Sequence, residues 1–437
     1  MGHRKGNVTC YRVTAEVSSP SANNGSVKEF QQEIQLISLP VFQFGIFYTS
    51  DLEINPRNNL TILGPVHSNG NIYIEPHQSS LVFKNSVTSA QNIYHHKHPE
   101  DPLVRQWGRI RNDSTSKSRI NSLVLPIGLV KDRSEFRSIS EIPPENEDPF
   151  SARGLQRYYN KADLILILND EGNRAFSGAH DDISINIPWT LIEISEAKPG
   201  KGKPEKGKRS GFLDSDVQFF DKREYSTVRA VEINLEDFLK SHKSLSAALG
   251  HPLRTLYIAD LRKSKAGFQS GVRLINGQSL PKYGLTIATL NPIYIQGDYN
   301  RGKGIKPASI AADSVTLLSK NWEDDHNTLG LDQRRADSTV INAAIITGTV
   351  PTGNGHYSGG VENAVRLLEN WRYRSLTIKG SLAVLFDSEL AISPWGIVPG
   401  IYSPPVRNFI WNEDFEEIKH LPPSTPELYS YASSFRI

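Results

Sequence analysis

The sequence predicts a mainly β protein whose body is a β-solenoid, similar to a parallel β-helix, with a small α/β insertion. Short apolar runs recur between Gly, Asn, Ser and Pro residues, a pattern typical of short strands and tight corners. The tripeptide Leu-Thr-Ile occurs at 60–62, 285–287 and 376–378, each time with a further apolar segment close behind it. Such recurrence favours stacked turns in which each short strand contributes one inward apolar row.

An antiparallel β-sandwich is the alternative fold. Asn69-Gly70 separates two apolar segments, and this dipeptide suits a two-residue hairpin turn. In a solenoid the same dipeptide would form a corner, where Gly and Asn tolerate positive φ angles and Asn side chains bond nearby backbone. The self-similarity has no fixed period, so the spacing alone leaves both folds open.

The chain divides into an N-terminal β segment at 1–50, a solenoid-like body at 51–94 and 281–390, an α/β insertion at 95–280, and a tail at 391–437. Within the insertion, residues 198–209 (KPGKGKPEKGKR) combine Lys, Gly and Pro, which predicts a flexible, solvated loop. The tail is rich in Pro and aromatic residues. We expect it to be extended over the body and anchored by Trp395, Phe409, Trp411 and Phe415.

The insertion holds the clearest helix signal. Apolar residues at helical spacing predict a helix over 235–249, with Asn234 as its N-cap and Gly250 at its end. Strands are expected at 163–168, 228–233 and 253–258. Downstream, the pattern at 361–371 predicts a second, short helix.

Composition excludes several classes of protein. The 437 residues carry a formal net charge of +2, so the chain offers no general electrostatic attraction for nucleic acid or anionic lipid. The single cysteine, Cys10, permits neither an internal disulfide nor a Cys-rich zinc site. No apolar run reaches the roughly 18 residues that span a bilayer. The alternating segment at 11–17 follows the N-terminus almost at once, so we expect that an export signal or anchor was lost upstream.

Histidine and acidic clusters do not identify a metal site. His95, His96 and His98 form the densest histidine group, with His77 or Asp101 as possible further ligands, but their spacing is not that of a structural metal site. A second cluster, Asp324-Asp325-His326 after Trp322, lies in a polar stretch. We expect both clusters to lie in surface loops, and we assign no metal ligand.

No catalytic or cofactor-binding residue is assigned either. Asp51, Glu53, Asp298 and Asp313 lie near predicted strand ends, but the sequence does not indicate which of them face each other as an acid pair. His67 and Ser68 are adjacent in a strand and therefore point to opposite faces, which argues against a catalytic triad. The Gly-rich segment at 352–360 lacks the spacing of a phosphate or dinucleotide loop and predicts a mobile turn.

Several blocks resemble bacterial pilus-assembly proteins of the PilX type and related uncharacterised envelope proteins. The resemblance rests on FQFGIFY at 42–48, DLEI at 51–54, GPVHSNGNIY at 64–73, NPIYIQGDYN at 291–300, GGVEN at 359–363, PPVRN at 404–408 and LPPSTP at 421–426. Members of that family usually begin with an apolar helix that anchors them and enters the pilus or its assembly platform, and the present sequence lacks this helix. The resemblance implies no catalytic residues.

We therefore predict a non-enzymatic protein of the bacterial cell envelope, periplasmic or at the cell surface. Its role would be the assembly of a type IV pilus or another surface structure through contacts with other pilus or envelope proteins. Membrane contact is expected only through the missing N-terminal anchor, and no nucleic acid partner or cofactor is expected. The alternatives are a carbohydrate-active β-helix enzyme, either a polysaccharide lyase or a glycosidase, and a glycan-binding module that stacks sugars on Trp322 or Trp395.

Overall fold

The protein is mainly β, and several of its sheets are parallel. The computed structural model describes residues 6–18, 27–126, 134–178, 184–194, 211–326, 328–396 and 399–436. The predicted basic loop at 198–209 lies outside these residues. Among the described residues, five sheets are present, and the largest has eleven strands.

The first set of strands runs from Ile46 to Lys117, and successive strands belong to different sheets. Each strand pairs in parallel with the strand three places later: Ile46 pairs with Val66, and Val66 with Val87. The same offset joins β4 to β7 and β5 to β8. The members are β3 (Ile46–Tyr48), β4 (Leu52–Ile54), β5 (Leu60–Ile62), β6 (Val66–Ser68), β7 (Ile72–Ile74), β8 (Ser80–Phe83), β9 (Val87–Ser89), β10 (Ile93–Tyr94), β11 (Arg109–Asn112) and β12 (Ser116–Lys117).

The second set of strands, from Leu164 to Trp411, is also mostly parallel. Only β13–β14 and β15–β16 pair antiparallel within it. Its members are β13 (Leu164–Asn169), β14 (Gly172–Phe176), β15 (Leu213–Asp221), β16 (Ser226–Asn234), β17 (Thr255–Asp260), β18 (Phe268–Ile275), β19 (Leu285–Thr289), β20 (Ile293–Gln296), β21 (Ala308–Ala312), β22 (Val315–Leu318), β23 (Thr339–Ile341), β24 (Ala344–Thr349), β25 (Arg366–Leu367), β26 (Ser375–Gly380), β27 (Leu382–Asp387) and β28 (Val406–Trp411).

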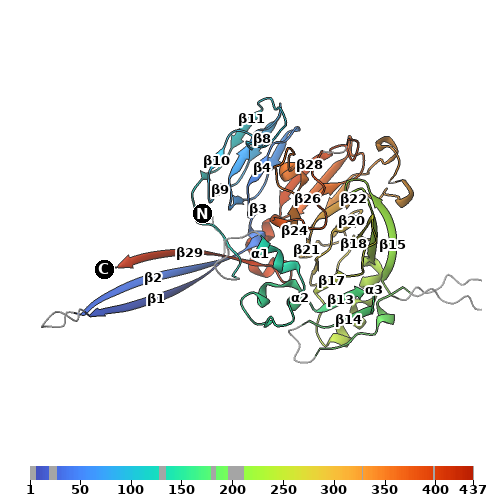
Figure 1. The fold of residues 1–437 in the computed structure, drawn as a ribbon, viewed down its shortest axis with the longest axis horizontal. Coiled ribbons are helices and arrows are strands. Elements are labelled where there is room, and N and C mark those ends of the chain that lie inside the picture. The colour runs from blue at the N-terminus through green and yellow to red at the C-terminus, as the bar shows by residue number, and fades with distance from the viewer. Residues whose placement is uncertain are drawn as a thin grey trace, which may run out of the picture.

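The two sets pair with each other. Strand β27 pairs in parallel with β3, and β28 with β5, so both of these sheets run continuously from one set into the other. Figure 1 shows the first set standing beside the second over one flank of the molecule. Strand pairing also crosses the predicted boundary at residue 280, because β17 pairs with β19. This parallel pairing contradicts the antiparallel β-sandwich that the sequence left open.

Asparagine and aspartate side chains bond the backbone where one strand turns into the next. The Oδ1 atom of Asn55 accepts a hydrogen bond from the Glu75 amide at 2.9 Å, and Asp51 Oδ1 accepts one from the Asn71 amide at 2.7 Å. Asn69-Gly70 lies between β6 and β7, which pair with other strands and not with each other. The dipeptide therefore forms a corner and not a hairpin, and Asn69 Nδ2 donates to the Leu123 carbonyl at 2.6 Å.

Helices are few. The prediction for 235–249 is confirmed by α3 (Leu235–Leu249), in which the Asn234 side chain accepts from two amides of the first turn and Gly250 ends the helix in the left-handed conformation. Two short helices, α1 (Ser134–Arg137) and α2 (Tyr158–Lys161), cover the large sheet. In the parts of the chain that the structure describes, no helix combines the length and apolar character needed to cross a membrane.

The helix predicted at 361–371 is wrong. The segment begins with a 3-10 turn, Gly360–Asn363, and continues as β25, which pairs in parallel with β22. Its apolar side chains are buried at more than one side of the segment, among them Val361, Val365 and Leu368. When protein packs on both sides of a short strand, the side chains on both of its faces are buried. In the sequence, the apolar residues of such a strand then have the same spacing as the buried face of a helix.

The ends of the chain form a three-stranded antiparallel sheet, here called the ribbon. It consists of β1 (Asn7–Ser18), β2 (Val27–Pro40) and β29 (Glu427–Arg436), in the order β1-β2-β29. Figure 1 shows the ribbon projecting well beyond the body. The tail at 391–437 thus supplies two strands: β28 in the body and β29 in the ribbon. Three of its four predicted anchors, Phe409, Trp411 and Phe415, are buried.

Asp313 secures the corner between β21 and β22. This fully buried carboxylate accepts hydrogen bonds from the amides of Glu389 and Ala391 at 2.8 and 3.0 Å and forms an ion pair with Arg137. It therefore joins α1, a corner of the second set and the segment that follows β27. A carboxylate with several charge-assisted donors in a dry site is costly to replace, because each donor is left without a partner.

Replacing Asp313 by Ala should lower the free energy of unfolding by about 3–5 kcal/mol, since it leaves several buried amides unpaired and removes the buried partner of Arg137. The remaining carboxylates near Arg137, Glu141 and Glu389, are exposed and lie 3.4 and 3.2 Å away. Urea denaturation of the purified protein measures this loss. Asp113→Ala is the matched control, because Asp113 pairs with Lys84 and Arg111 at the surface, where such pairs contribute at most about 1 kcal/mol. Equal effects of the two substitutions would contradict the structural role of Asp313.

Candidate functional site

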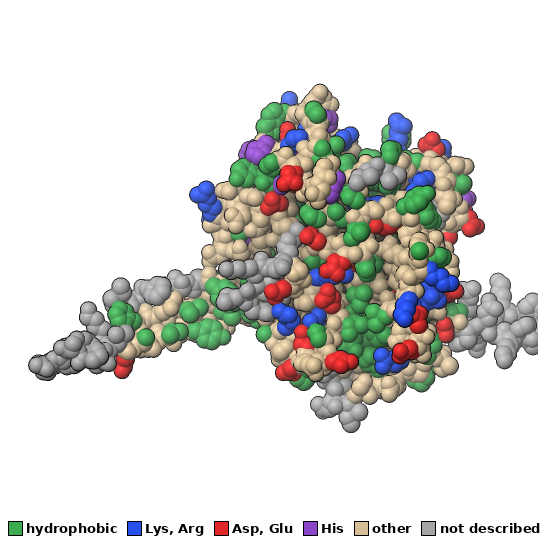
Figure 2. Space-filling view, in the orientation of Figure 1, with side chains coloured by type: hydrophobic (Ala, Val, Ile, Leu, Met, Phe, Trp, Pro, Cys, Tyr) green, Lys and Arg blue, Asp and Glu red, His purple; other side chains and the backbone are tan. Residues whose placement is uncertain are grey.

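One face of the ribbon is apolar and exposed. In the ribbon register, Tyr11 pairs with Ile34 and Leu36 with Tyr431, and Val13 and Phe30 lie on the same face because alternate residues of a strand point the same way. Tyr11, Val13, Phe30 and Tyr431 are 52%, 49%, 39% and 48% exposed. Figure 2 shows apolar side chains gathered along the ribbon. These residues, with Ile34 and Leu36, are called the apolar ribbon face.

The opposite face of the ribbon is polar except where Val8 pairs with Ile37. Arg12 pairs with Glu33 across the strands at 3.3 Å, and Gln35 lies opposite the exposed Cys10. The ribbon is therefore amphipathic in the manner of a sheet that packs one side against another element and presents the other to water. Soluble proteins seldom leave a contiguous apolar surface uncovered unless it binds something.

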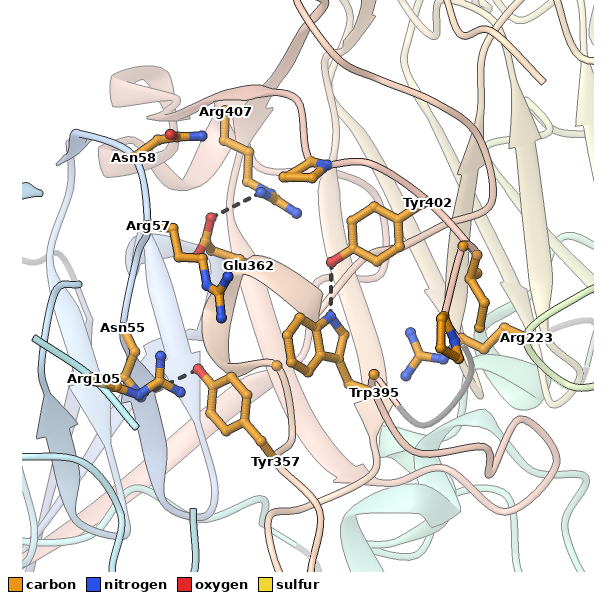
Figure 3. Close-up of a pocket in the computed structure, with 16 residues that line it drawn as sticks. Asn55, Arg57, Asn58, Arg105, Arg223, Tyr357, Glu362, Trp395, Tyr402 and Arg407 are labelled. Carbon is orange, nitrogen blue, oxygen red and sulfur yellow. Dashed lines mark hydrogen bonds and ion pairs between the residues drawn. The ribbon is translucent and has the colours of Figure 1, made fainter. Parts of the chain in front are cut away.

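A second candidate site is a cavity of about 260 Å³ in the body, here called the basic pocket. Five separate segments meet there: the residues after β4, the segment before β11, the turn between β15 and β16, the Gly-rich segment with its 3-10 turn, and the chain from Trp395 into β28. Figure 3 shows their side chains converging. The charged and aromatic lining residues are Arg57, Arg105, Arg223, Arg407, Glu362, Tyr357, Trp395 and Tyr402.

Two of the four arginines have carboxylate partners. Arg105 Nη2 lies 2.5 Å from Asp101, and Arg407 Nη1 lies 2.9 Å from Glu362. Arg223 is buried but bonds only neutral acceptors, the Asn363 side chain at 2.7 Å and the Ser393 carbonyl at 3.2 Å. Burial, with help from Arg366, lowers the pKa of Arg223 to about 9, so its guanidinium is still charged at neutral pH.

The aromatic residues of the basic pocket hold one another in place. The rings of Tyr357 and Trp395 meet edge to face with centroids 5.4 Å apart, and Trp395 Nε1 donates to Tyr402 Oη at 2.8 Å. The guanidinium of Arg105 lies 4.5 Å from the centroid of the Tyr357 ring. Gly359 has a φ of +84°, and a Cβ there would lie 2.8 Å from the Trp395 ring. This close approach requires glycine in a segment that the sequence predicted only as a mobile turn.

A separate acidic pocket of about 230 Å³ lies on the other side of the Gly-rich segment. It brings together Asp51 and Glu53, two of the four carboxylates considered from the sequence, and His98 lies 3.6 Å from Asp51. Glu53 Oε1 accepts from Ser358 at 2.9 Å, and burial raises the pKa of Glu53. Asp298 and Asp313 lie elsewhere: Asp298 binds the Val340 amide and Arg301.

Residues of the histidine and Asp324 clusters make packing and ion-pair contacts with their neighbours. His96 and His98 pack against the ring of Tyr73, at centroid distances of 5.8 and 4.8 Å. Asp324 binds Arg273 and accepts from Trp322 Nε1 at 2.9 Å. Within the described ranges, no group of three or more His, Cys, Asp or Glu residues is placed to hold a metal ion. Trp322 is buried, so it offers no surface for a sugar, whereas Trp395 lines the basic pocket.

Comparison with known proteins identifies no relative from which to transfer a function. No protein-family model and no curated protein matches the chain. Among solved structures, the chain is similar to the competence-associated pilin ComZ from Thermus thermophilus, with 9% identity, a TM-score of 0.32, and coverage of 98% of this chain and 81% of the pilin.

Glu369 supports the wall of the basic pocket from behind. Its carboxylate accepts from the amide and hydroxyl of Ser319 at 2.6 and 2.7 Å, and its carbonyl accepts from the Ser403 amide. Arg334, which binds the carbonyls of Gly400 and Ile401 in the same wall, lies near enough to lower the pKa of Glu369. Burial has the larger effect and raises that pKa to about 7.

Stability should therefore fall as the pH rises from 5 to 7. The folded protein keeps the Glu369 proton over this range and the unfolded chain loses it, so the free energy of unfolding declines by at most about 1.4 kcal/mol per pH unit. The decline should end above pH 7, where both states are ionised. Urea denaturation at pH 5 to 8 tests this with Glu369→Gln, which should make the decline shallower; what remains is due to other buried carboxylates with raised pKa values, such as Glu53 and Asp221. Identical slopes for both proteins would show that Glu369 does not cause it.

Proposed function

We propose that this protein is a non-enzymatic component of a bacterial surface structure, such as a type IV pilus, and that it binds an apolar α-helix of the assembly through the apolar ribbon face. The observation that carries the proposal is this one-sided, exposed apolar surface on a projecting sheet. The resemblance to PilX-type proteins adds to it, because members of that family enter the pilus through an apolar helix. We further propose a location in the cell envelope, with other pilus or envelope proteins as partners.

The dimensions of the ribbon favour a single helix as the occupant. Three strands about 4.8 Å apart are roughly 10 Å wide, which matches the diameter of one α-helix with its side chains. The 12 residues of β1 extend over about 40 Å, the length of a helix of about 25 residues. An amphipathic sheet becomes stable when its apolar face is buried, and a helix laid along it is one of the few architectures that achieve this.

We propose that the body is a β-solenoid that acts as a stiff spacer. The three-strand offset of the first set supports this interpretation, since each sheet receives one strand from every turn. Pairing of β3 with β27 and of β5 with β28 extends the stack across both sets. A coil of this kind holds the ribbon and the distal surfaces at a fixed separation, which suits assembly more than chemistry.

A fluorophore on the ribbon tests the proposed occupant. Val13 lies on the apolar ribbon face and Cys10 on the polar face, so a polarity-sensitive dye is attached either to Cys10 or to V13C in a C10S background. The probe is a synthetic Leu/Ala helix of about 25 residues with lysines at both ends, matched to the ribbon length. We expect a blue shift at position 13 and none at position 10, and Tyr11→Ser should weaken binding about tenfold, as expected for losing a buried aromatic side chain.

A peptide of the same composition interrupted by prolines is the control and should cause no shift. A shift at position 13 that needs no peptide and grows with protein concentration would identify a second copy as the occupant and contradict the helix. Equal shifts at both positions, or none, would also contradict it. Genes for pilins, a prepilin peptidase or a secretion ATPase beside the gene for this chain would support the pilus, and their absence would weaken that assignment.

A further inference from the structure

We propose that the basic pocket binds an acidic saccharide, one sugar ring with a carboxylate at a time, as in a uronic-acid polymer. The body would then bind a ligand of its own, in addition to the helix proposed for the ribbon. The basic pocket lies on the body, lined by loops between strands of both sets, whereas the proposed helix lies along the ribbon. The two proposals therefore succeed or fail separately.

The positive charge of the basic pocket favours an anionic ligand. Four arginines and one glutamate line it, and Asp101 and Glu362 neutralise Arg105 and Arg407. Arg57 is exposed and has no ion pair among the described residues, and Arg223 bonds only neutral groups. Neither arginine therefore has a direct carboxylate ion pair among the described residues, although Glu224 and Asp221 lie near enough to Arg223 to oppose the lowering of its pKa by burial. Guanidinium groups bind planar carboxylates through paired hydrogen bonds, which is the reason that arginine recurs in such sites.

The aromatic side chains favour a ligand that carries a sugar ring beside its anionic group. Tyr357, Trp395 and Tyr402 form one wall (Figure 3), and the polar N–H of Trp395 is already bonded to Tyr402. The indole therefore presents carbon surface to the cavity. The C–H groups on one face of a sugar ring are electropositive and pack on the negative face of an aromatic ring. An inorganic anion would gain nothing from this wall.

Arg407 places a buried guanidinium group in the wall of the basic pocket. Its side chain is about nine-tenths buried and points into the cavity, and its Nε atom has no hydrogen-bond partner in the described structure. The ion pair with Glu362 at 2.9 Å fixes the direction of this guanidinium in the wall of the pocket, where its positive charge adds to that of Arg57 and Arg223.

A single-stranded nucleic acid fits these observations less well. Such strands need a long positive groove with several stacking platforms, but the arginines converge on a compact cavity of about 260 Å³ and the chain has a net charge of only +2. One acidic ring with its neighbours projecting from the mouth matches the volume and the charge better. A nucleic acid is therefore an outcome that the test must be able to reveal.

The experiment is isothermal titration of the full chain with a defined oligogalacturonate, its methyl-esterified form, inorganic phosphate and a thymidine oligonucleotide. We expect binding of the oligogalacturonate alone, weakened by added salt because the attraction is ionic. Arg57→Ala should weaken binding roughly tenfold, as the loss of one charge-assisted contact, and Trp395→Ala should do the same. Arg109→Ala, which removes an exposed arginine from β11 outside the pocket, should change nothing.

Arg57 is exposed, so its replacement should leave the fold intact, and unchanged circular dichroism and unfolding midpoints check this for each variant. Equal binding of the esterified and free oligosaccharides would overturn the role of the carboxylate. Binding of phosphate alone, of the oligonucleotide alone, or of nothing would overturn the proposal. So would binding that Arg57→Ala and Arg109→Ala reduce equally. The ribbon fluorescence assay remains informative whichever result is obtained.

Discussion

The parallel pairing of β3 with β27 is the constraint on which the remaining structure depends. It joins residues 46–48 to residues 382–384, more than three hundred positions apart, and makes one sheet of two sets of strands. Gly64 allows the same junction to close: its φ is +100°, and a Cβ there would lie 2.4 Å from Trp411. Without this junction the segment after β4 would not meet the Gly-rich segment or β28, and neither pocket would exist.

Very short strands can sustain such a stack because their corners are satisfied by side chains. Strands of three residues, such as β4 and β7, contribute few ladder hydrogen bonds. The corner amides of Asn71 and Glu75 therefore depend on Asp51 and Asn55 of the preceding turn. Buried backbone groups require partners whatever the strand length. This requirement explains why Asn, Ser and Gly are abundant between the apolar runs of the sequence.

The sequence predicted elements whose signals lie within one segment, and it missed elements that depend on residues far away in the chain. The helix at 235–249 was identified with its cap because both signals lie within the segment itself. Recurring short apolar runs likewise predicted a mainly β chain. The false helix at 361–371 arose because burial on two faces imitates helical spacing. Strand β29 was missed because its partner, β2, lies nearly four hundred residues earlier in the chain.

The basic pocket could not be predicted for the same reason. Arg57, Arg105, Arg223 and Arg407 share no motif or spacing, and each looks like an ordinary charged residue in its own segment. Trp395 had a signal, as an aromatic residue in a proline-rich stretch, and Tyr357 and Gly359 lie in the Gly-rich segment that the sequence singled out as a turn. The carboxylates show the converse: Asp51 and Glu53 are two residues apart and do line one cavity, because alternate residues of a strand share a face.

The apolar ribbon face and the basic pocket differ in how many parts of the fold are needed to form them. The apolar ribbon face is made by alternation within three long strands, so it needs nothing from the body except an attachment point. The basic pocket needs five segments held together by buried groups such as Arg223 and Glu369. The pocket-lining segments lie on the body and the apolar ribbon face on the projecting sheet, so a ligand at one surface need not contact residues of the other. This separation lets one chain with a net charge of only +2 present an apolar surface on the ribbon and a cluster of four arginines on the body.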